Sequence, residues 1–95
     1  MVYSNVILRA IEASDIDELK RLLTTQAEVS LTEPGCERFA VYHSEAEPEI
    51  FLLIEWWATQ EDLDAHRATS HFVSVYRPRA MPLVERFPHP CQRLI

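Results

Sequence analysis

The chain has only one glycine, Gly35, and this scarcity excludes the glycine-rich loops that bind phosphate groups and dinucleotides. Its two cysteines, Cys36 and Cys91, are too few for a disulfide framework, so we expect reduced thiols in a cytoplasmic protein. No apolar run approaches the roughly 20 residues of a membrane-spanning helix. The N-terminus also lacks the basic and apolar regions of a signal peptide. The sequence therefore predicts neither membrane insertion nor secretion.

Basic residues are also few. Nine Lys and Arg face fifteen Asp and Glu, which gives a formal charge of −6. This balance argues against binding to nucleic acid, whose affinity comes from cations on phosphates, and against an anionic membrane surface. No metal-ligand spacing of His or Cys is visible, so we expect no metal site. The 95 residues, 47% of them hydrophobic, predict a single globular domain over residues 1–95.

The first third of the chain predicts a strand followed by a helix. Residues 2–11 place apolar side chains on both faces, which is typical of a strand covered on both sides. Ser14 and Asp17 have capping-box spacing, so we expect a helix to begin there. Apolar residues then recur at helical spacing as far as about Val29.

Two more strands and a second helix are predicted in the middle of the chain. Residues 37–43 alternate between two faces, which indicates a strand. An apolar run beginning at Phe51 indicates a third strand that ends at Trp57. Thr59 and Asp62 again have capping-box spacing, so the second helix should follow directly.

The C-terminal part is rich in proline. A further helical segment is expected from Ser70, and Pro78 should end or kink it. We expect irregular chain until Cys91 and a short last strand over residues 92–95. The element order β-α-β-β-α-β predicts an α+β, ferredoxin-like fold, with helices on one face of a four-stranded antiparallel sheet. Apolar residues on the other face predict a homodimer.

Several short motifs resemble the antibiotic biosynthesis monooxygenase (ABM) family. They are EPGC at 33–36, FLLIEWW at 51–57, Ala65-His66 and His71-Phe72, and the similarity covers nearly the whole chain. The resemblance implies a dimeric α+β barrel, with a small pocket between the sheet and the helices of each subunit. It fits putative quinol monooxygenases, which act without a cofactor.

His66 is the first candidate for a catalytic residue. It shares a helix face with Leu63, so it should point toward the core, and imidazole titrates close to working pH. One interpretation is a general base in a pocket. The alternative is a core histidine that hydrogen-bonds a backbone carbonyl or Asp62.

Glu55 and Trp57 lie on one strand face, and a carboxylate at the end of a buried strand needs a partner. We expect Glu55 to pair with Arg9 or Arg77, or to hold His66 in one tautomer, and we assign it a catalytic role. The expected substrate-binding residues are Trp57, His71, Tyr76 and Asn5. His71 should cap or gate the pocket and Tyr76 should line its mouth, whereas Trp57 also suits a core anchor.

These observations favour a homodimeric, cofactor-independent monooxygenase of a small aromatic quinol or polyphenol. In that reaction a base removes a phenolic proton, and the electron-rich anion reduces O₂ directly. Two alternatives remain open at this point: an isomerase of a small carbonyl compound that uses the same base, and a non-catalytic dimeric module that binds a small molecule.

Overall fold

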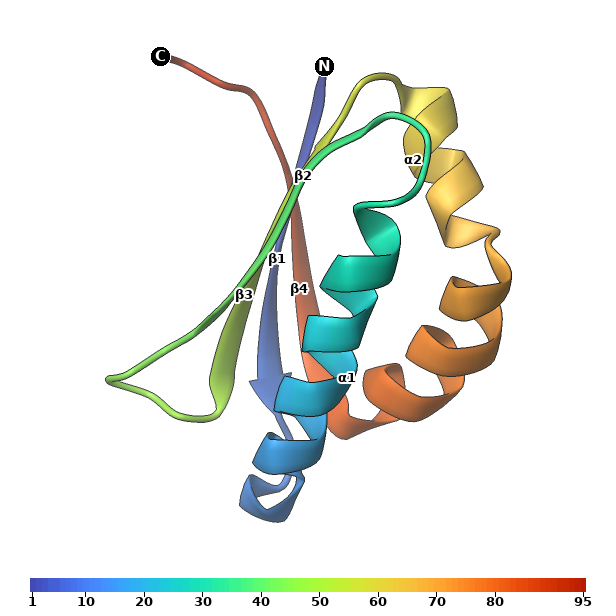
Figure 1. Ribbon diagram of the computed structural model, residues 1–95. Coiled ribbons are helices and arrows are strands. Elements are labelled where there is room, and N and C mark those ends of the chain that lie inside the picture. The colour runs from blue at the N-terminus through green and yellow to red at the C-terminus, as the bar shows by residue number, and fades with distance from the viewer.

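The computed structural model describes residues 1–95, which form one four-stranded antiparallel sheet with helices packed on it (Figure 1). The elements in chain order are β1 (Val2–Ala10), η1 (Ala13–Asp15), α1 (Ile16–Ser30), β2 (Cys36–His43), β3 (Ile50–Trp57), α2 (Gln60–Arg67), η2 (Phe72–Ala80), η3 (Met81–Leu83) and β4 (Val84–Cys91). The strand order is β2-β3-β1-β4. The predicted ferredoxin-like α+β fold is therefore confirmed.

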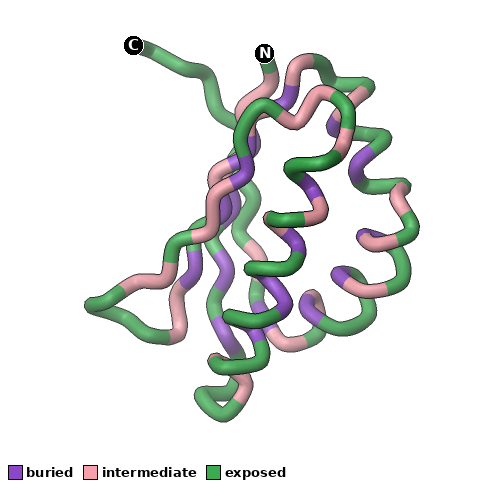
Figure 2. Tube along the Cα trace, viewed as in Figure 1, coloured by how far each residue is buried: buried purple, intermediate pink, exposed green.

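The helices cover one face of the sheet, and the core lies between the two layers (Figure 1). Buried and more exposed positions alternate along β1 and β3, because successive strand residues point to opposite faces (Figure 2). The main core cluster contains Val6, Leu8, Ala10, Leu19, Leu22, Leu23, Phe51, Leu53, Phe72, Tyr76, Ala80 and Val84. A smaller cluster of Phe39, Trp57 and Leu63 lies beside it. No helix is both long and apolar enough to cross a membrane.

The predicted cap of the first helix is not formed. The segment around Ser14 is instead a 3-10 turn, and α1 begins at Ile16 without a side-chain cap. A backbone hydrogen bond from Asp15 N–H to the Glu12 carbonyl closes this turn. One N–H group at the start of the helix is therefore bonded without the serine side chain. At the second helix the prediction is correct, since Thr59 accepts a hydrogen bond from the Asp62 N–H at 3.1 Å.

Pro78 neither ends nor breaks the third helical segment. Helical residues begin at Ser70, as expected, but the segment continues as the π-helix η2 through Pro78 to Ala80. In an α-helix the proline ring clashes with the carbonyl four residues earlier. The wider π turn forms its bonds five residues apart instead, so it does not require that close approach.

The last strand also differs from the prediction. It spans Val84–Cys91, whereas residues 92–95 have no regular structure. β4 pairs with β1 only and is therefore an edge strand. Pro88 and Pro90 are two residues apart, so the positions of their missing N–H groups lie on the same side of the strand. On the side of an edge strand that faces away from the sheet, no neighbouring strand needs a donor, and prolines are tolerated there.

The face of the sheet opposite the helices is uncovered (Figure 1). Four large apolar side chains on this face are 36–49% exposed, and they come from all four strands: Ile7, Tyr42, Leu52 and Phe87. A contiguous apolar surface of this kind marks a contact site more often than free surface.

Gly35 occupies a position that other residues tolerate poorly. Its φ is +77°, and a Cβ added there would overlap the carboxylate of Asp62. Asp62 belongs to the cap of α2, through Thr59. We expect Gly35→Ala to destabilise the protein by about 2–3 kcal/mol, from left-handed strain and loss of the cap. Urea unfolding measures this, and a change below about 0.5 kcal/mol would contradict the role assigned to Gly35.

Candidate active site

His66 lies in the last turn of α2, on the face that packs against the sheet. It is only 4% exposed. The cap at Thr59 fixes where α2 begins, and the helical repeat then places Leu63 and His66 on the same inward face. The sequence prediction that this histidine points into the core is therefore correct.

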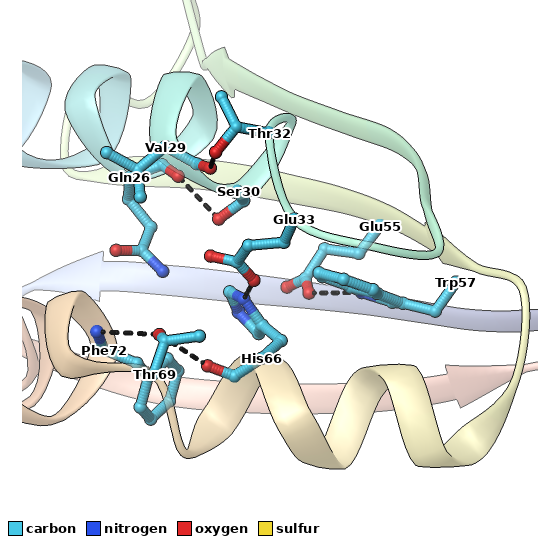
Figure 3. A network of polar contacts seen from close by, with 10 residues as sticks. All are labelled: Gln26, Val29, Ser30, Thr32, Glu33, Glu55, Trp57, His66, Thr69 and Phe72. Atoms are coloured by element: carbon cyan, nitrogen blue, oxygen red, sulfur yellow. Dashed lines mark hydrogen bonds and ion pairs between the residues drawn. The ribbon is translucent and has the colours of Figure 1, made fainter.

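The partner of His66 is Glu33, in the loop between α1 and β2 (Figure 3). Nδ1 of His66 lies 2.6 Å from Oε1 of Glu33, whose side chain is 12% exposed. One interpretation of the sequence predicts that Asp62 or a backbone carbonyl bonds the imidazole. The structure shows neither, because Asp62 bonds Thr59 and His66 bonds Glu33. Because the carboxylate accepts the Nδ1 proton, the Nε2 atom is left as a proton acceptor.

Aromatic rings surround the imidazole of His66. The centroid of the nearest Trp57 ring lies 4.6 Å away, that of Phe72 lies 5.2 Å away, and that of Phe39 lies 5.9 Å away. These rings exclude water from around the imidazole and hold the orientation of its plane. They come from β3, η2 and β2, so the position of His66 depends on the packing of both layers.

Glu55 is bound by the tryptophan on its own strand. The indole N–H of Trp57 donates to Oε1 of Glu55 at 3.1 Å, and Glu55 is 6% exposed (Figure 3). The shared strand face was predicted correctly. The expected partners Arg9, Arg77 and His66 are not its hydrogen-bond partners. Arg9 points to the opposite face of the sheet, because its neighbours Leu8 and Ala10 are buried.

Burial changes the proton affinity of three side chains in this region. Desolvation raises the pKa of Glu55 to about 7, against the hydrogen bond from Trp57 and the charges of Arg67 and Arg86. Desolvation lowers the pKa of His66, while the carboxylate of Glu33 opposes this shift. Desolvation also raises the pKa of Tyr76. At neutral pH, His66 is therefore an unprotonated base beside a carboxyl group that can donate a proton.

A small cavity opens between the sheet and the helices beside these residues. Its polar lining consists of Ser4, Gln26, Glu55, His66, Arg67, Tyr76 and Arg86. Its apolar walls are Val6, Phe39, Leu53, Phe72 and Pro88. The envelope with its open mouth measures about 370 Å³, whereas the part free to hold water is about 20 Å³. The smaller value describes the usable space, which is enough for one or two water molecules.

The structure brings His66, Glu55 and Tyr76 together at this cavity. Trp57 packs on His66 and donates to Glu55 but does not itself line the cavity. Tyr76 is 4% exposed, so it lies inside the cavity rather than at its mouth. His71 is in the first turn of the third helical segment and does not line the cavity, although its charge contributes to the lowered pKa of His66.

Asn5 lies on the uncovered face of the sheet, apart from the other candidates. Its Nδ2 donates to the sulfur of Cys91 at 3.2 Å, and it lines a separate surface hollow near the C-terminus. Because Ser4 and Val6 point into the cavity, the side chain between them must point away from it.

Sequence reasoning missed Glu33, Gln26 and Arg86 as parts of the site. Glu33 was interpreted only as part of a turn, and 33 positions separate it from His66. Gln26 did carry a usable signal, because it interrupts the apolar stripe of α1 that begins with Leu19. Arg86 lies in β4, and the prolines of this segment predict irregular chain rather than a strand.

The thiols and the other acidic groups form no further site. Both cysteines are free, and burial raises the pKa of Cys36 to about 11, so this thiol stays protonated. No group of three or more His, Cys, Asp or Glu side chains lies close enough together to hold a metal ion.

The raised pKa of Glu55 predicts a pH-dependent cost to stability. The unfolded carboxyl group loses its proton near pH 4.5, while the folded one keeps it up to about pH 7. The contribution of Glu55 to the free energy of unfolding therefore falls as pH rises through that window, by about 3 kcal/mol at most. We expect Glu55→Gln to gain stability relative to the unmodified protein between pH 5 and pH 8, measured by urea unfolding. A constant difference across this range would contradict the raised pKa.

Comparison with known proteins identifies the family. Residues 1–77 match the family model for antibiotic biosynthesis monooxygenase. An uncharacterised Synechocystis protein, sll1783, is 38% identical over 56 residues. That match covers 59% of this chain but only 38% of the Synechocystis protein.

Solved structures share the fold. A conserved Bacteroides thetaiotaomicron protein of unknown function aligns with a TM-score of 0.89 at 24% identity, over 97% of this chain and 96% of that one. A Nitrosomonas europaea protein named "putative antibiotic biosynthesis monooxygenase" aligns with a TM-score of 0.86 at 24% identity, over 98% of this chain and 90% of that one. At these identities the likeness establishes the fold alone. Together with the family model, these comparisons lead to one conclusion: the chain belongs to the antibiotic biosynthesis monooxygenase family.

Proposed function

We propose that the protein is a cofactor-independent monooxygenase of a small aromatic quinol or polyphenol, with His66 as the base. The observation that carries this proposal is the pairing of Glu33 with His66, which lines a cavity with aromatic walls. The carboxylate occupies Nδ1 and leaves Nε2 to accept a proton from a ligand hydroxyl. It also stabilises the imidazolium that forms.

The reaction balances without another redox partner, because the quinol supplies the electrons. Nε2 of His66 takes a phenolic proton, and the resulting anion reduces O₂ and forms a C–O bond to one oxygen atom. The O–O bond then breaks, and the second oxygen leaves as water. Overall, one quinol and one O₂ give one hydroxyquinone and one H₂O. Glu55, whose pKa is raised to about 7, is suited to donate a proton to the departing oxygen.

Substrate binding requires the cavity to widen. Pockets for small organic ligands measure roughly 300–1,000 Å³, well above the 20 Å³ now free for water. Phe72 and Tyr76 line one wall and belong to the π-helix η2. π-helical turns occur often at functional sites, and we propose that this wall moves outward to admit the ring of the substrate. Trp57, which packs on His66, is then reached by the ligand only in the widened cavity, and His71 follows the movement of the wall.

The uncovered sheet face suits a homodimer. Its four exposed apolar side chains, together with Trp56, form a surface that a second copy of the chain can cover with the same residues. Asn5 and Cys91 lie on this face, so we assign Asn5 to the neighbourhood of the interface. The two free cysteines suit a reducing cytoplasm.

The narrow cavity also supports a second candidate, a module that binds a small molecule without converting it. An isomerase of a small carbonyl compound would use the same base. Oxygen uptake with a panel of reduced quinones separates these functions. If the protein is the monooxygenase, oxygen uptake should exceed autoxidation and should persist in the presence of a chelator. Binding without uptake would favour the module, and conversion of a carbonyl compound without uptake would favour the isomerase.

A further inference from the structure

We propose that Gln26 is a specificity-determining residue whose side-chain amide binds a second hydroxyl group of the ligand, distinct from the one that faces His66. This inference rests on the proposed function for the identity of the cavity as the substrate site. Its test uses binding alone, so that the two proposals can fail separately.

Gln26 is buried without a hydrogen-bond partner for its oxygen. It is 2% exposed and lies on the inward face of α1, among leucines. Oε1 has no partner, although almost all buried polar atoms in proteins have one. The side chain extends from α1 toward His66 and Thr69 (Figure 3) and lines the cavity. Gln26 is therefore a residue of the cavity wall whose acceptor atom is unused.

A second unused polar atom lines the same cavity. Nε of Arg86, on β4, is buried and has no hydrogen-bond partner. An amide oxygen needs a donor and a guanidinium nitrogen needs an acceptor, and a hydroxyl group provides both. In the closed cavity both atoms are shielded from solvent, so a ligand hydroxyl reaches them only when the wall formed by η2 moves outward.

Two residues of the cavity lining thus carry an acceptor for the ligand, His66 through Nε2 and Gln26 through Oε1. The apolar walls of the cavity, which include Phe39, Leu53 and Phe72, suit a flat ring. The cavity is therefore complementary to a ring that carries two hydroxyl groups. A ligand that lacks the second hydroxyl leaves Gln26 buried without a donor, and sites of this kind discriminate strongly against such analogues.

The test compares two ligands, 1,4-dihydroxynaphthalene and 4-methoxy-1-naphthol, in anaerobic titrations of the full chain followed by tryptophan fluorescence. The methyl ether keeps one hydroxyl and an acceptor oxygen but loses the second donor. We expect the unmodified protein to bind the diol about 10- to 100-fold more tightly. Gln26→Met has nearly the same shape and should bind both ligands with similar affinity. Gln92→Met, in the exposed C-terminal segment, is the matched control and should keep the preference.

Thermal unfolding separates ligand recognition from a structural role. Removing an unpaired buried acceptor should leave the melting temperature of Gln26→Met unchanged or raised. If this variant does not fold, Gln26→Asn withdraws the amide by one methylene group and should lose most of the preference. Equal binding of the two ligands by the unmodified protein, or binding of neither, would overturn the inference. A preference retained in Gln26→Met would overturn it too, as would a lowered melting temperature with both affinities reduced in proportion. Selective binding without oxygen uptake would instead overturn only the oxygenase.

Discussion

His66→Gln is expected to lower kcat/KM for 1,4-dihydroxynaphthalene by about 10²- to 10⁴-fold, the usual contribution of a general base. The imidazole is the unprotonated base of the cavity, because burial lowers its pKa. Glutamine fills much of the same space but cannot accept a proton at neutral pH. Initial rates of oxygen uptake measure the effect, and circular dichroism checks that the variant is folded. The exposed His89 offers a control, since His89→Gln should keep the rate.

Glu33→Gln distinguishes the role of His66 as the base from the role of Glu33, which positions it. The amide can still bond to Nδ1, but it removes the charge that raises the pKa of His66, so that pKa should fall further. We therefore expect a smaller loss of rate than in His66→Gln, with the acidic limb of the pH–rate profile moved to lower pH. A folded His66→Gln variant with full activity, or an unmoved acidic limb in Glu33→Gln, would contradict the paired roles of these residues.

Trp57→Ala is expected to lower the free energy of unfolding by about 3–5 kcal/mol, as found for large aromatic residues in cores. Trp57 is fully buried and is the largest side chain in its core cluster. The variant also loses the hydrogen bond to Glu55 and the ring that packs on His66. A loss of this size is a large part of the total stability of a small domain, so urea unfolding should show it clearly.

Trp57→Phe divides this effect into packing and hydrogen bonding. Phenylalanine keeps most of the buried area but cannot donate to Glu55, so the pKa of Glu55 should rise further above its ordinary value. We expect a loss of stability about half that of Trp57→Ala or less, with the rest due to the cavity that alanine leaves. Equal losses in the two variants would contradict a packing role for the indole.

The fold could be predicted from local patterns. Apolar periodicity located the strands and helices, and the Thr59–Asp62 pair marked the start of α2. The errors occurred where a residue was judged without its neighbours. Pro88 and Pro90 argue against a strand in isolation, but β4 is an edge, where missing donors do no harm. Pro78 likewise argues against a helix, yet the π-helix accommodates it.

The site could be predicted only in part. The helical spacing from Leu63 was enough to orient His66, and alternation along β3 was enough to place Glu55 beside Trp57. The partner of His66 could not be predicted in this way, because Glu33 meets it only when α1, β2 and α2 pack together. Pairing across loops depends on tertiary geometry, which periodicity does not contain.

The proposed reaction places one atom of O₂ in an aromatic substrate without any oxidant other than O₂. The most direct test is mass spectrometry of the product formed from 1,4-dihydroxynaphthalene under ¹⁸O₂ in unlabelled water with a chelator. We expect a hydroxynaphthoquinone that carries one ¹⁸O atom, formed by the unmodified protein and lost with His66→Gln. An unlabelled hydroxynaphthoquinone, or only 1,4-naphthoquinone at the rate of autoxidation, would contradict it.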